Sequence, residues 1–271
     1  MQNLLAALMG LVEGLTEFLP ISSTGHLVLA GNLSGFDAEV GKEMANAFKI
    51  VIQLGAILAI VAVYPGRFTR LLQFGDNRGL SGFRGLGLLA ITSLPAAVLG
   101  LLAHHRIEAL FQDRAVVAAL AVGAVWILAV ENYRPRVKVE GLDSLTWKDA
   151  LNVGLFQCLS LWPGMSRSAC TILGGMMTGV ERKTATEYSF LAAVPIMTAA
   201  TLFEFYKKHA LILAGNKTVF AVGFVVSFVS AWLAVKVFLR FVGNHTLTPF
   251  GWYRLAAAAT ALAWLRMSGQ L

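Results

Sequence analysis

The chain has 271 residues, of which 57% are hydrophobic and only 14% are charged. Soluble domains carry roughly 25% charged residues, so the composition excludes an ordinary soluble protein and predicts a membrane protein with several spans. The formal net charge of +7 would suit a nucleic-acid partner. However, the basic residues fall in short loops between apolar segments, which is typical of membrane proteins. We therefore expect the lipid bilayer, and no nucleic acid, as a partner.

Apolar segments set the expected fold class. A helix that crosses the hydrocarbon core needs about 20 mostly apolar residues. Six segments fit and predict an all-α polytopic membrane protein with about six transmembrane helices, at 47–64, 86–103, 115–131, 188–205, 219–239 and 252–265.

Two further apolar segments are interrupted and do not fit a simple span. Segment 4–33 contains Glu13, Glu17, Pro20 and a run of small polar residues, and segment 150–179 is broken around Pro163. Irregular backbone at membrane depth is tolerated only where protein or trapped water satisfies its polar groups. Each segment therefore predicts two short helices joined as a re-entrant hairpin.

The two interrupted segments resemble each other at an offset of about 144 positions, which aligns Glu13 with Gln157 and Ser22 with Ser166. Each is followed by three predicted spans, and an odd number of crossings inverts one repeat relative to the other. We expect one membrane domain, 1–271, with repeats at about 1–131 and 150–271. Paired, interrupted segments of this kind indicate a central site. The alternative is chance similarity between two glycine-rich stretches.

The distribution of basic residues predicts the orientation. Placing the basic loops 65–85 and 132–149 in the cytoplasm, by the positive-inside rule, also places Arg254 on the inner side and both termini outside. The first hairpin then enters from outside and the second from the cytoplasm, so that their tips meet inside the bilayer.

Glu13 and Glu17 are four residues apart, so a helix would place them on one face. Two carboxylates in a dry setting repel each other, and a divalent cation, a shared proton or a nearby arginine must offset the repulsion. Carboxylate oxygens suit Mg²⁺ or Ca²⁺, and Mg²⁺ is often held by one or two carboxylates together with substrate phosphates.

Hydroxyls, an imidazole and a guanidinium follow the two breaks. Pro20 ends the first helix, and Ser166 begins the corresponding helix of the second hairpin. Helix N-termini favour anions, and an arginine suits bidentate contact with a phosphate. The residues expected to bind phosphate are Ser22, Thr24, Ser166, Arg167 and Ser168, and those expected to act in catalysis are Glu17, Ser23, His26 and Arg167. Alternatively, His26 is a buried histidine with satisfied hydrogen bonds, and Arg167 neutralises a glutamate.

Two long motifs, 13–26 and 163–168, carry a family resemblance, together with the segments 53–57, 156–158 and 187–195. Through them the sequence closely resembles the undecaprenyl-diphosphate phosphatase family, also called bacitracin resistance proteins. The resemblance covers essentially the whole chain. It implies a bacterial inner-membrane enzyme that removes one phosphate from a C55 polyprenyl diphosphate and regenerates the carrier for peptidoglycan synthesis. It also implies dependence on a divalent cation and a site open to the periplasm. By position, Glu13 and Glu17 match the acidic motif of the family, and His26 matches the histidine of that motif. Residues 166–168 match the second motif of the family.

Two mechanisms fit these residues. Either Ser23 attacks the phosphorus with His26 as general base, or His26 or Glu17 activates a water molecule while Ser23 binds phosphate. A different function class, a lipid flippase or secondary transporter, also fits an inverted repeat with broken helices. The sequence leaves open whether the chain forms a homodimer.

Overall fold

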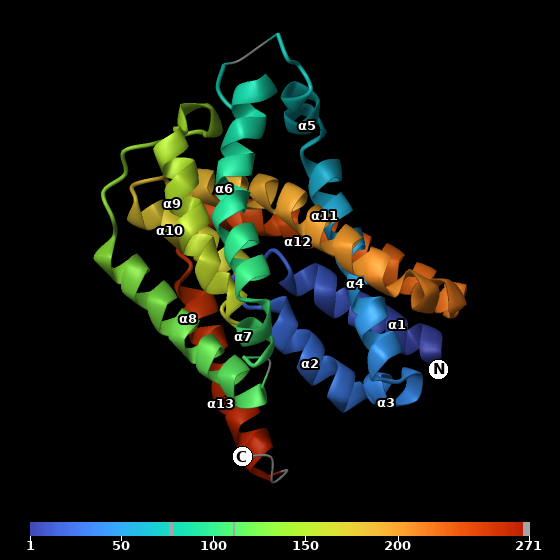
Figure 1. Cartoon of the computed structure of the whole chain (residues 1–271). Coiled ribbons are helices and arrows are strands. Elements are labelled where there is room, and N and C mark those ends of the chain that lie inside the picture. Colours follow the sequence, from blue (N-terminus) through green and yellow to red (C-terminus); the bar gives the residue numbers. More distant parts are fainter. Residues whose placement is uncertain (76–77, 111, 268–271) are drawn as a thin grey trace.

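The computed structural model describes residues 1–75, 78–110 and 112–267. These residues form thirteen α-helices and two short 3₁₀ helices, and their only extended pairing is an isolated bridge between Val139 and Val180 (Figure 1). The predicted all-α class is confirmed.

Five helices in the described part of the chain are long and apolar enough to cross a membrane, which confirms a polytopic membrane protein. They are α4 (Lys42–Val63), α6 (Gly82–Leu102), α8 (Asp113–Tyr133), α11 (Arg182–Ala214) and α12 (Lys217–Asn244). Each overlaps one of the predicted spans. Short helices lie in the segments beside them: α5 (Pro65–Leu71) and α7 (His104–Glu108) each join two of the five, α3 (Phe36–Val40) precedes α4, and the 3₁₀ helix Leu142–Ser144 follows α8.

The last helix differs from the prediction in two ways. The sixth predicted span, 252–265, lies in α13 (Thr248–Met267), which is helical but is not one of the five apolar helices. Two arginines, Arg254 and Arg266, with two threonines, two tryptophans and a tyrosine, make it less apolar than the others. Arg254, which the sequence groups with the basic residues of the inner side, has a completely buried side chain, so it is not an exposed residue of a basic loop.

The two interrupted segments are each a pair of short helices. The first consists of α1 (Gln2–Thr16) and α2 (Ser23–Ser34). The second consists of α9 (Trp147–Gln157), the 3₁₀ helix Cys158–Leu161 and α10 (Arg167–Met177). At 1.5 Å per residue, the 15-residue α1 is about 22 Å long, which is less than the roughly 30 Å of a hydrocarbon core.

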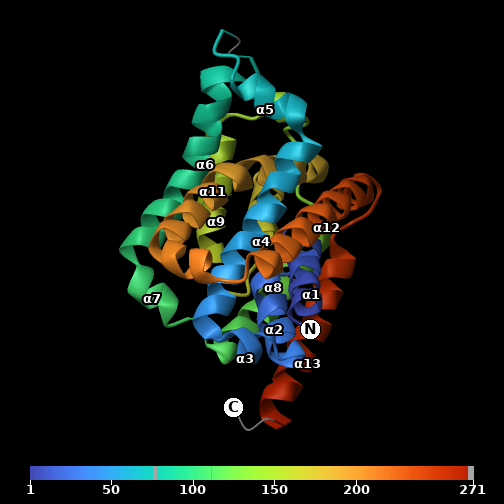
Figure 2. The ribbon, with the colours of Figure 1, turned by 90° about the vertical axis from the view of Figure 1, so that its right-hand side faces the viewer.

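Packing links the two halves of the chain. Helix α1 lies against α12, and α9 lies against α6, so the first helix of each pair contacts a long helix from the other half. The α1–α12 approach is close: a Cβ on Gly10 would overlap the carbonyl of Gly223. Helices α8 and α13 form another packed pair. In both views α13 extends to the opposite end of the molecule from α5 (Figure 2).

Two serines share an uncommon backbone conformation. Ser22 immediately precedes α2 with φ of 73°, and Ser166 immediately precedes α10 with φ of 72°. Positive φ is unfavourable for residues with a Cβ, costs about 1–3 kcal/mol, and persists only where surrounding contacts hold it. The same strained turn therefore opens the second helix of each pair.

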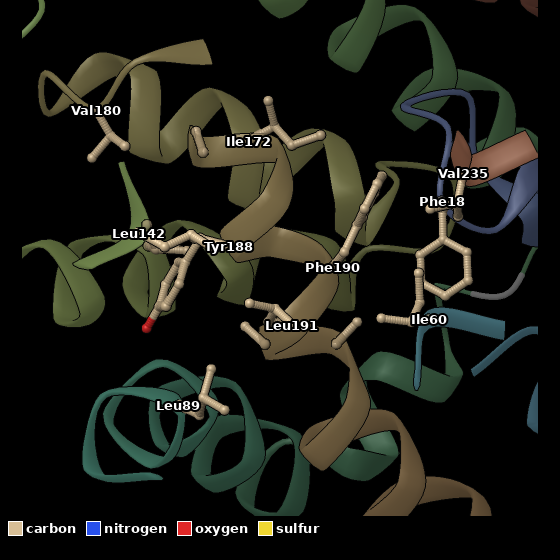
Figure 3. Packing of buried hydrophobic residues seen from close by; sticks show 14 of the residues in the cluster. Phe18, Ile60, Leu89, Leu142, Ile172, Val180, Tyr188, Phe190, Leu191 and Val235 are labelled. Atoms are coloured by element: carbon tan, nitrogen blue, oxygen red, sulfur yellow. The ribbon is translucent and has the colours of Figure 1, made fainter. Parts of the chain in front are cut away.

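Each pair is interrupted by a short irregular segment, which we call a break: residues 17–22 between α1 and α2, and residues 162–166 before α10. A phenylalanine anchors the first break in the core. Phe18 is fully buried and makes an edge-on contact with Phe190 of α11, with ring centroids 5.4 Å apart. Figure 3 shows Phe18 beside Ile60 of α4 and near Val235 of α12. Because Phe18 directly follows Glu17, this packing fixes the position of the glutamate backbone.

Asp143 fastens the loop before α9 to the segment around α5. Its carboxylate accepts hydrogen bonds from the Leu80 N–H at 2.9 Å and from Arg67 Nη1 at 3.1 and 3.2 Å, and Arg70 Nη1 lies 3.7 Å away. Burial alone raises the pKa of Asp143. The hydrogen bonds from Leu80 and Arg67, with the charges of both arginines, outweigh burial and lower the pKa below its ordinary value.

We predict that Asp143→Asn lowers the free energy of unfolding by about 1 kcal/mol at pH 7, a modest amount because the group is partly exposed. The lowered pKa means that the carboxylate stabilises the fold above pH 4 or so and loses this effect as the pH falls further. Thermal unfolding in detergent should therefore show a difference from wild type at pH 7 that shrinks at pH 3. The exposed loop substitution Glu140→Gln is the control; an equal loss there would contradict the assignment.

Candidate active site

Glu17 joins the two breaks. It directly follows α1, and only 7% of its side chain is exposed. Its Oε2 accepts a hydrogen bond from the Ser23 hydroxyl at 2.6 Å, and its Oε1 accepts one from Arg167 Nη2 at 3.1 Å. The structure thus brings together three residues that the sequence predicts to be catalytic, from positions 150 residues apart.

Arg167 is held by groups of several kinds. Besides the contact with Glu17, its Nη1 donates to the Ser189 carbonyl and its Nη2 lies near the Met197 sulfur, both at 3.2 Å. The guanidinium carbon lies 5.4 Å from the centroid of the Phe18 ring. The buried Nε has no hydrogen-bond partner in the described part of the chain. This N–H is a donor that an anion at the site can use.

The hydroxyls predicted to bind phosphate have different surroundings. Ser166 Oγ accepts a hydrogen bond from the Ala169 N–H at 3.3 Å and pairs with Ser168 Oγ at 3.0 Å. Ser168 Oγ also donates to the Leu19 carbonyl of the first break at 2.9 Å. In this structure Ser166 and Ser168 therefore cap α10 and tie the two breaks together. Ser22 is buried before α2, and Thr24 is half-buried in its first turn.

His26 lies one turn into α2, and both of its ring nitrogens are engaged. Nδ1 lies 2.7 Å from the Ser22 carbonyl, which can only accept, so we assign the proton to Nδ1. Nε2 then accepts from the Tyr253 hydroxyl at 2.7 Å, and the two rings stack at 5.6 Å. Within the described residues no hydrogen bond joins His26 to Ser23. In this geometry Glu17 is the acceptor for the Ser23 proton.

Both breaks present helix N-termini. Helices α2 and α10 begin at residues 23 and 167, and their first N–H groups have no partner within the helix. Such groups, with the helix dipole, favour a phosphate or another anion. The site therefore combines N–H donors, a guanidinium and a hydroxyl that already donates to a carboxylate.

The family model described as bacitracin resistance protein BacA matches residues 6–260. The chain belongs to the BacA family. Relatives from Solidesulfovibrio magneticus and Maridesulfovibrio salexigens, both called undecaprenyl-diphosphatase, are 53% and 54% identical to it over 95% of this chain and 96% of their own. A relative of the same name from Aromatoleum aromaticum is 46% identical over 96% of this chain and 93% of its own.

Glu13 is the residue of this BacA family member best suited to meet a cation. It is 1% exposed, and its Oε2 has no hydrogen-bond partner among the described residues. Those residues contain no group of three or more His, Cys, Asp or Glu side chains that could hold a metal. Two carboxylates fit Mg²⁺ only where water or substrate oxygens supply the remaining ligands, which is how Mg²⁺ is often bound.

Sequence reasoning missed two residues of α13 that reach this site. Tyr253 contacts His26, and the neighbouring Arg254 is fully buried against both breaks. A usable signal was present: an ionisable residue inside an alanine-rich apolar segment is a candidate functional residue by default. The sequence analysis instead counted Arg254 with the basic residues of the loops, although its side chain is buried.

We predict that Tyr253→Phe lowers kcat by about tenfold with little change in KM. The substitution keeps the stacked ring but removes the hydroxyl that orients Nε2 of His26, and oriented acid–base groups contribute about 10²–10⁴ to rates. Steady-state phosphate release in detergent is the measurement.

Tyr206→Phe provides the matched control, because Tyr206 also stacks on a histidine, His209, outside this site. It should leave kcat unchanged. An unchanged rate in Tyr253→Phe would show that the hydroxyl contact with His26 has no part in turnover.

Proposed function

We propose that this protein hydrolyses undecaprenyl diphosphate to undecaprenyl phosphate and inorganic phosphate. The observation that carries the proposal is the carboxylate of Glu17, which contacts both the Ser23 hydroxyl and the Arg167 guanidinium. This arrangement supplies a proton acceptor, a nucleophile and a cation for the transferring phosphoryl group. The names of relatives at 53% and 54% identity support the same substrate.

We further propose that the two short-helix pairs are re-entrant hairpins in an inverted repeat of one membrane domain, with repeats at about 1–131 and 150–271 and α13 as a sixth span. The offset of about 144 positions that aligns the two sequences also aligns the two serines with positive φ, Ser22 and Ser166. The exchange of contacts, α1 with α12 and α9 with α6, supports the same relation between the halves.

For location, we propose the bacterial inner membrane, with the site open to the periplasm. Five apolar helices and bacterial relatives support a multi-pass membrane protein. The basic loops 65–85 and 132–149 support the orientation through the positive-inside rule. The diphosphate would then enter between the two breaks while the prenyl chain stays in lipid.

In the favoured reaction sequence, Ser23 Oγ attacks the terminal phosphorus and passes its proton to Glu17. The bond between that phosphorus and the bridging oxygen breaks, and undecaprenyl phosphate leaves. Water then attacks the phosphoserine, giving phosphate and restoring the Ser23 hydroxyl. The 2.6 Å contact between Ser23 Oγ and Glu17 Oε2 favours this order over direct attack by water.

Arg167 and the N-termini of α2 and α10 stabilise negative charge on the transferring group, because their donors are fixed before the reaction. His26, held by Ser22 and Tyr253, serves the proton transfers of the second stage. Glu13, together with Glu17, is proposed to hold a divalent cation, Mg²⁺ or Ca²⁺, which would supply further neutralisation of phosphate charge when bound.

A lipid flippase is the second candidate, since the proposed inverted repeat with broken helices is also a transporter architecture. The two functions differ in one requirement. Transport needs two separated compartments, whereas hydrolysis proceeds in solution.

We predict that the purified protein in detergent micelles releases inorganic phosphate from a polyprenyl diphosphate. A chelator should abolish the release, and added Mg²⁺ should restore it. Protein that is folded, supplied with Mg²⁺ and still unable to release phosphate would contradict the enzymatic proposal and favour transport.

We also predict that Ser23→Ala lowers kcat by at least about 10³-fold, because it removes the proposed nucleophile. Wild-type protein quenched during turnover should carry phosphate on Ser23, detectable by mass spectrometry of the peptide. Ser34→Ala, at the far end of α2, is the control. Near wild-type turnover by Ser23→Ala would exclude the phosphoserine route.

A further inference from the structure

Arg254 occupies a cradle made entirely of backbone carbonyls. Its side chain has no exposed surface. Nη1 donates to Pro20 O at 3.2 Å and Met165 O at 2.9 Å, and Nη2 donates to Ala119 O at 3.1 Å and Gly164 O at 2.9 Å. Nε donates to Leu120 O at 3.2 Å. The guanidinium therefore contacts the first break, the second break and α8 at once.

This environment is unusual for a buried cation. None of the ion pairs found among the described residues includes Arg254. A buried charge without a counter-ion is strongly unfavourable unless dipoles replace its hydration. Five carbonyl oxygens meet all five donors of a guanidinium. The charge is thus stabilised only while both breaks hold their carbonyls in place.

Three of the carbonyls belong to the breaks themselves. Pro20 O, Gly164 O and Met165 O lie outside the helices, and no backbone N–H donates to them in the described part of the chain. Buried carbonyls without a partner are costly. Arg254 and the two breaks therefore stabilise each other: the cation needs the carbonyls, and the carbonyls need a donor.

The cradle adjoins the reacting groups. Pro20 lies midway between Glu17 and Ser23 in the chain, and Met165 is two residues before Arg167. Along the chain, Ser22 lies between Pro20 and Ser23, and Ser166 lies between Met165 and Arg167. Both serines have positive φ. Such backbone persists only where its surroundings hold it, and Arg254 supplies a fixed contact just before each strained serine.

We propose that Arg254 is a positioning residue: it docks both hairpin breaks on α8 and so sets the placement of Glu17, Ser23 and Arg167. This inference rests on the proposed phosphatase activity for its kinetic consequence, and on structure alone for the docking itself. Arg254 touches no group that we assign to the chemistry. It acts through the backbone of residues that do.

The fit is specific for a planar guanidinium. Gly123 of α8 faces it, and a Cβ at that position would overlap the guanidinium. A lysine ammonium offers three donors from one point, whereas the five carbonyls surround a plane. We therefore expect Arg254→Lys to fold but to leave carbonyls unpaired.

The first test is kinetic. Arg254→Lys and Arg254→Ala should lower kcat by about 100-fold, the cost of misplacing reacting groups by about 1 Å, with KM within about threefold because phosphate contacts remain. Millimolar guanidinium ion should restore part of the Arg254→Ala rate by refilling the cradle, and equal concentrations of ammonium should not. Gly123→Ala should also lower kcat, because its methyl group would displace the guanidinium while the arginine itself remains.

Arg182→Ala is the matched control. Arg182 makes comparable hydrogen bonds, to Glu131 at 2.6 and 2.8 Å and to the His245 carbonyl, but contacts neither break. It should lower the unfolding temperature and leave kcat per folded molecule unchanged. A wild-type kcat in folded Arg254→Lys, or a fall in kcat in the Arg182 control as large as in Arg254→Lys, would overturn the proposal.

The second test does not depend on catalysis. Hydrogen exchange followed by mass spectrometry should show faster exchange of the amides in 17–23 and 162–168 in Arg254→Lys, with Arg182→Ala unchanged there. Faster exchange at both breaks would support docking whether or not the wild-type protein releases phosphate. A failure of the wild-type protein to release phosphate would count only against the enzymatic proposal. Unchanged exchange at both breaks would refute the positioning role.

Discussion

The buried contact between Glu17 and Arg167 is the interaction on which the arrangement of the two halves depends. The two groups meet at 3.1 Å although 150 residues separate them. Removing one member of a buried pair leaves an uncompensated charge and costs about 3–5 kcal/mol. The two breaks are therefore required to meet, because neither charge is tolerated alone in this surrounding. The ring of Phe18 lies against the guanidinium of Arg167, with its centroid 5.4 Å from the guanidinium carbon, and so shields one side of the pair from water.

Where a helix is interrupted, some backbone carbonyls and some backbone N–H groups lose their helical partners. In this structure the two kinds of group have different partners. The carbonyls left at Pro20, Gly164 and Met165 are bound by Arg254. At the start of α10 the Ala169 N–H is capped by the Ser166 hydroxyl, and we propose that the other first N–H groups of α2 and α10 serve an anion. One cation thus satisfies the electronegative ends of both breaks. We propose that the donors of the electropositive ends bind phosphate, since these groups are already fixed in position.

Much of this site could be predicted because its signals are local. Glu17, Ser23 and Arg167 lie in polar runs that interrupt apolar segments, where an ionisable group needs a functional explanation. Arg254 carries part of this signal, since it is an ionisable group in an apolar segment, but the sequence does not predict its role, because its partners are five backbone carbonyls, which every residue carries. Its neighbour Tyr253 reaches His26 across 227 positions. The span pattern likewise predicted five apolar helices correctly but not the weaker hydropathy of α13.

The two glutamates, both predicted as metal ligands and only Glu17 as catalytic, have different surroundings. Both oxygens of Glu17 are engaged, one by Ser23 and one by Arg167, whereas Glu13 keeps a buried oxygen without a hydrogen-bond partner. A proton acceptor must be free to take the serine proton, and a cation bound directly at Glu17 Oε2 would compete with the Ser23 hydroxyl for that oxygen. The arrangement therefore favours a division in which Glu13 supplies most of the contact with a cation and Glu17 serves the serine. Glu13 lies in α1 and Glu17 directly follows it with helical backbone, so the four-residue spacing turns both side chains to one side, where the proposed cation would lie.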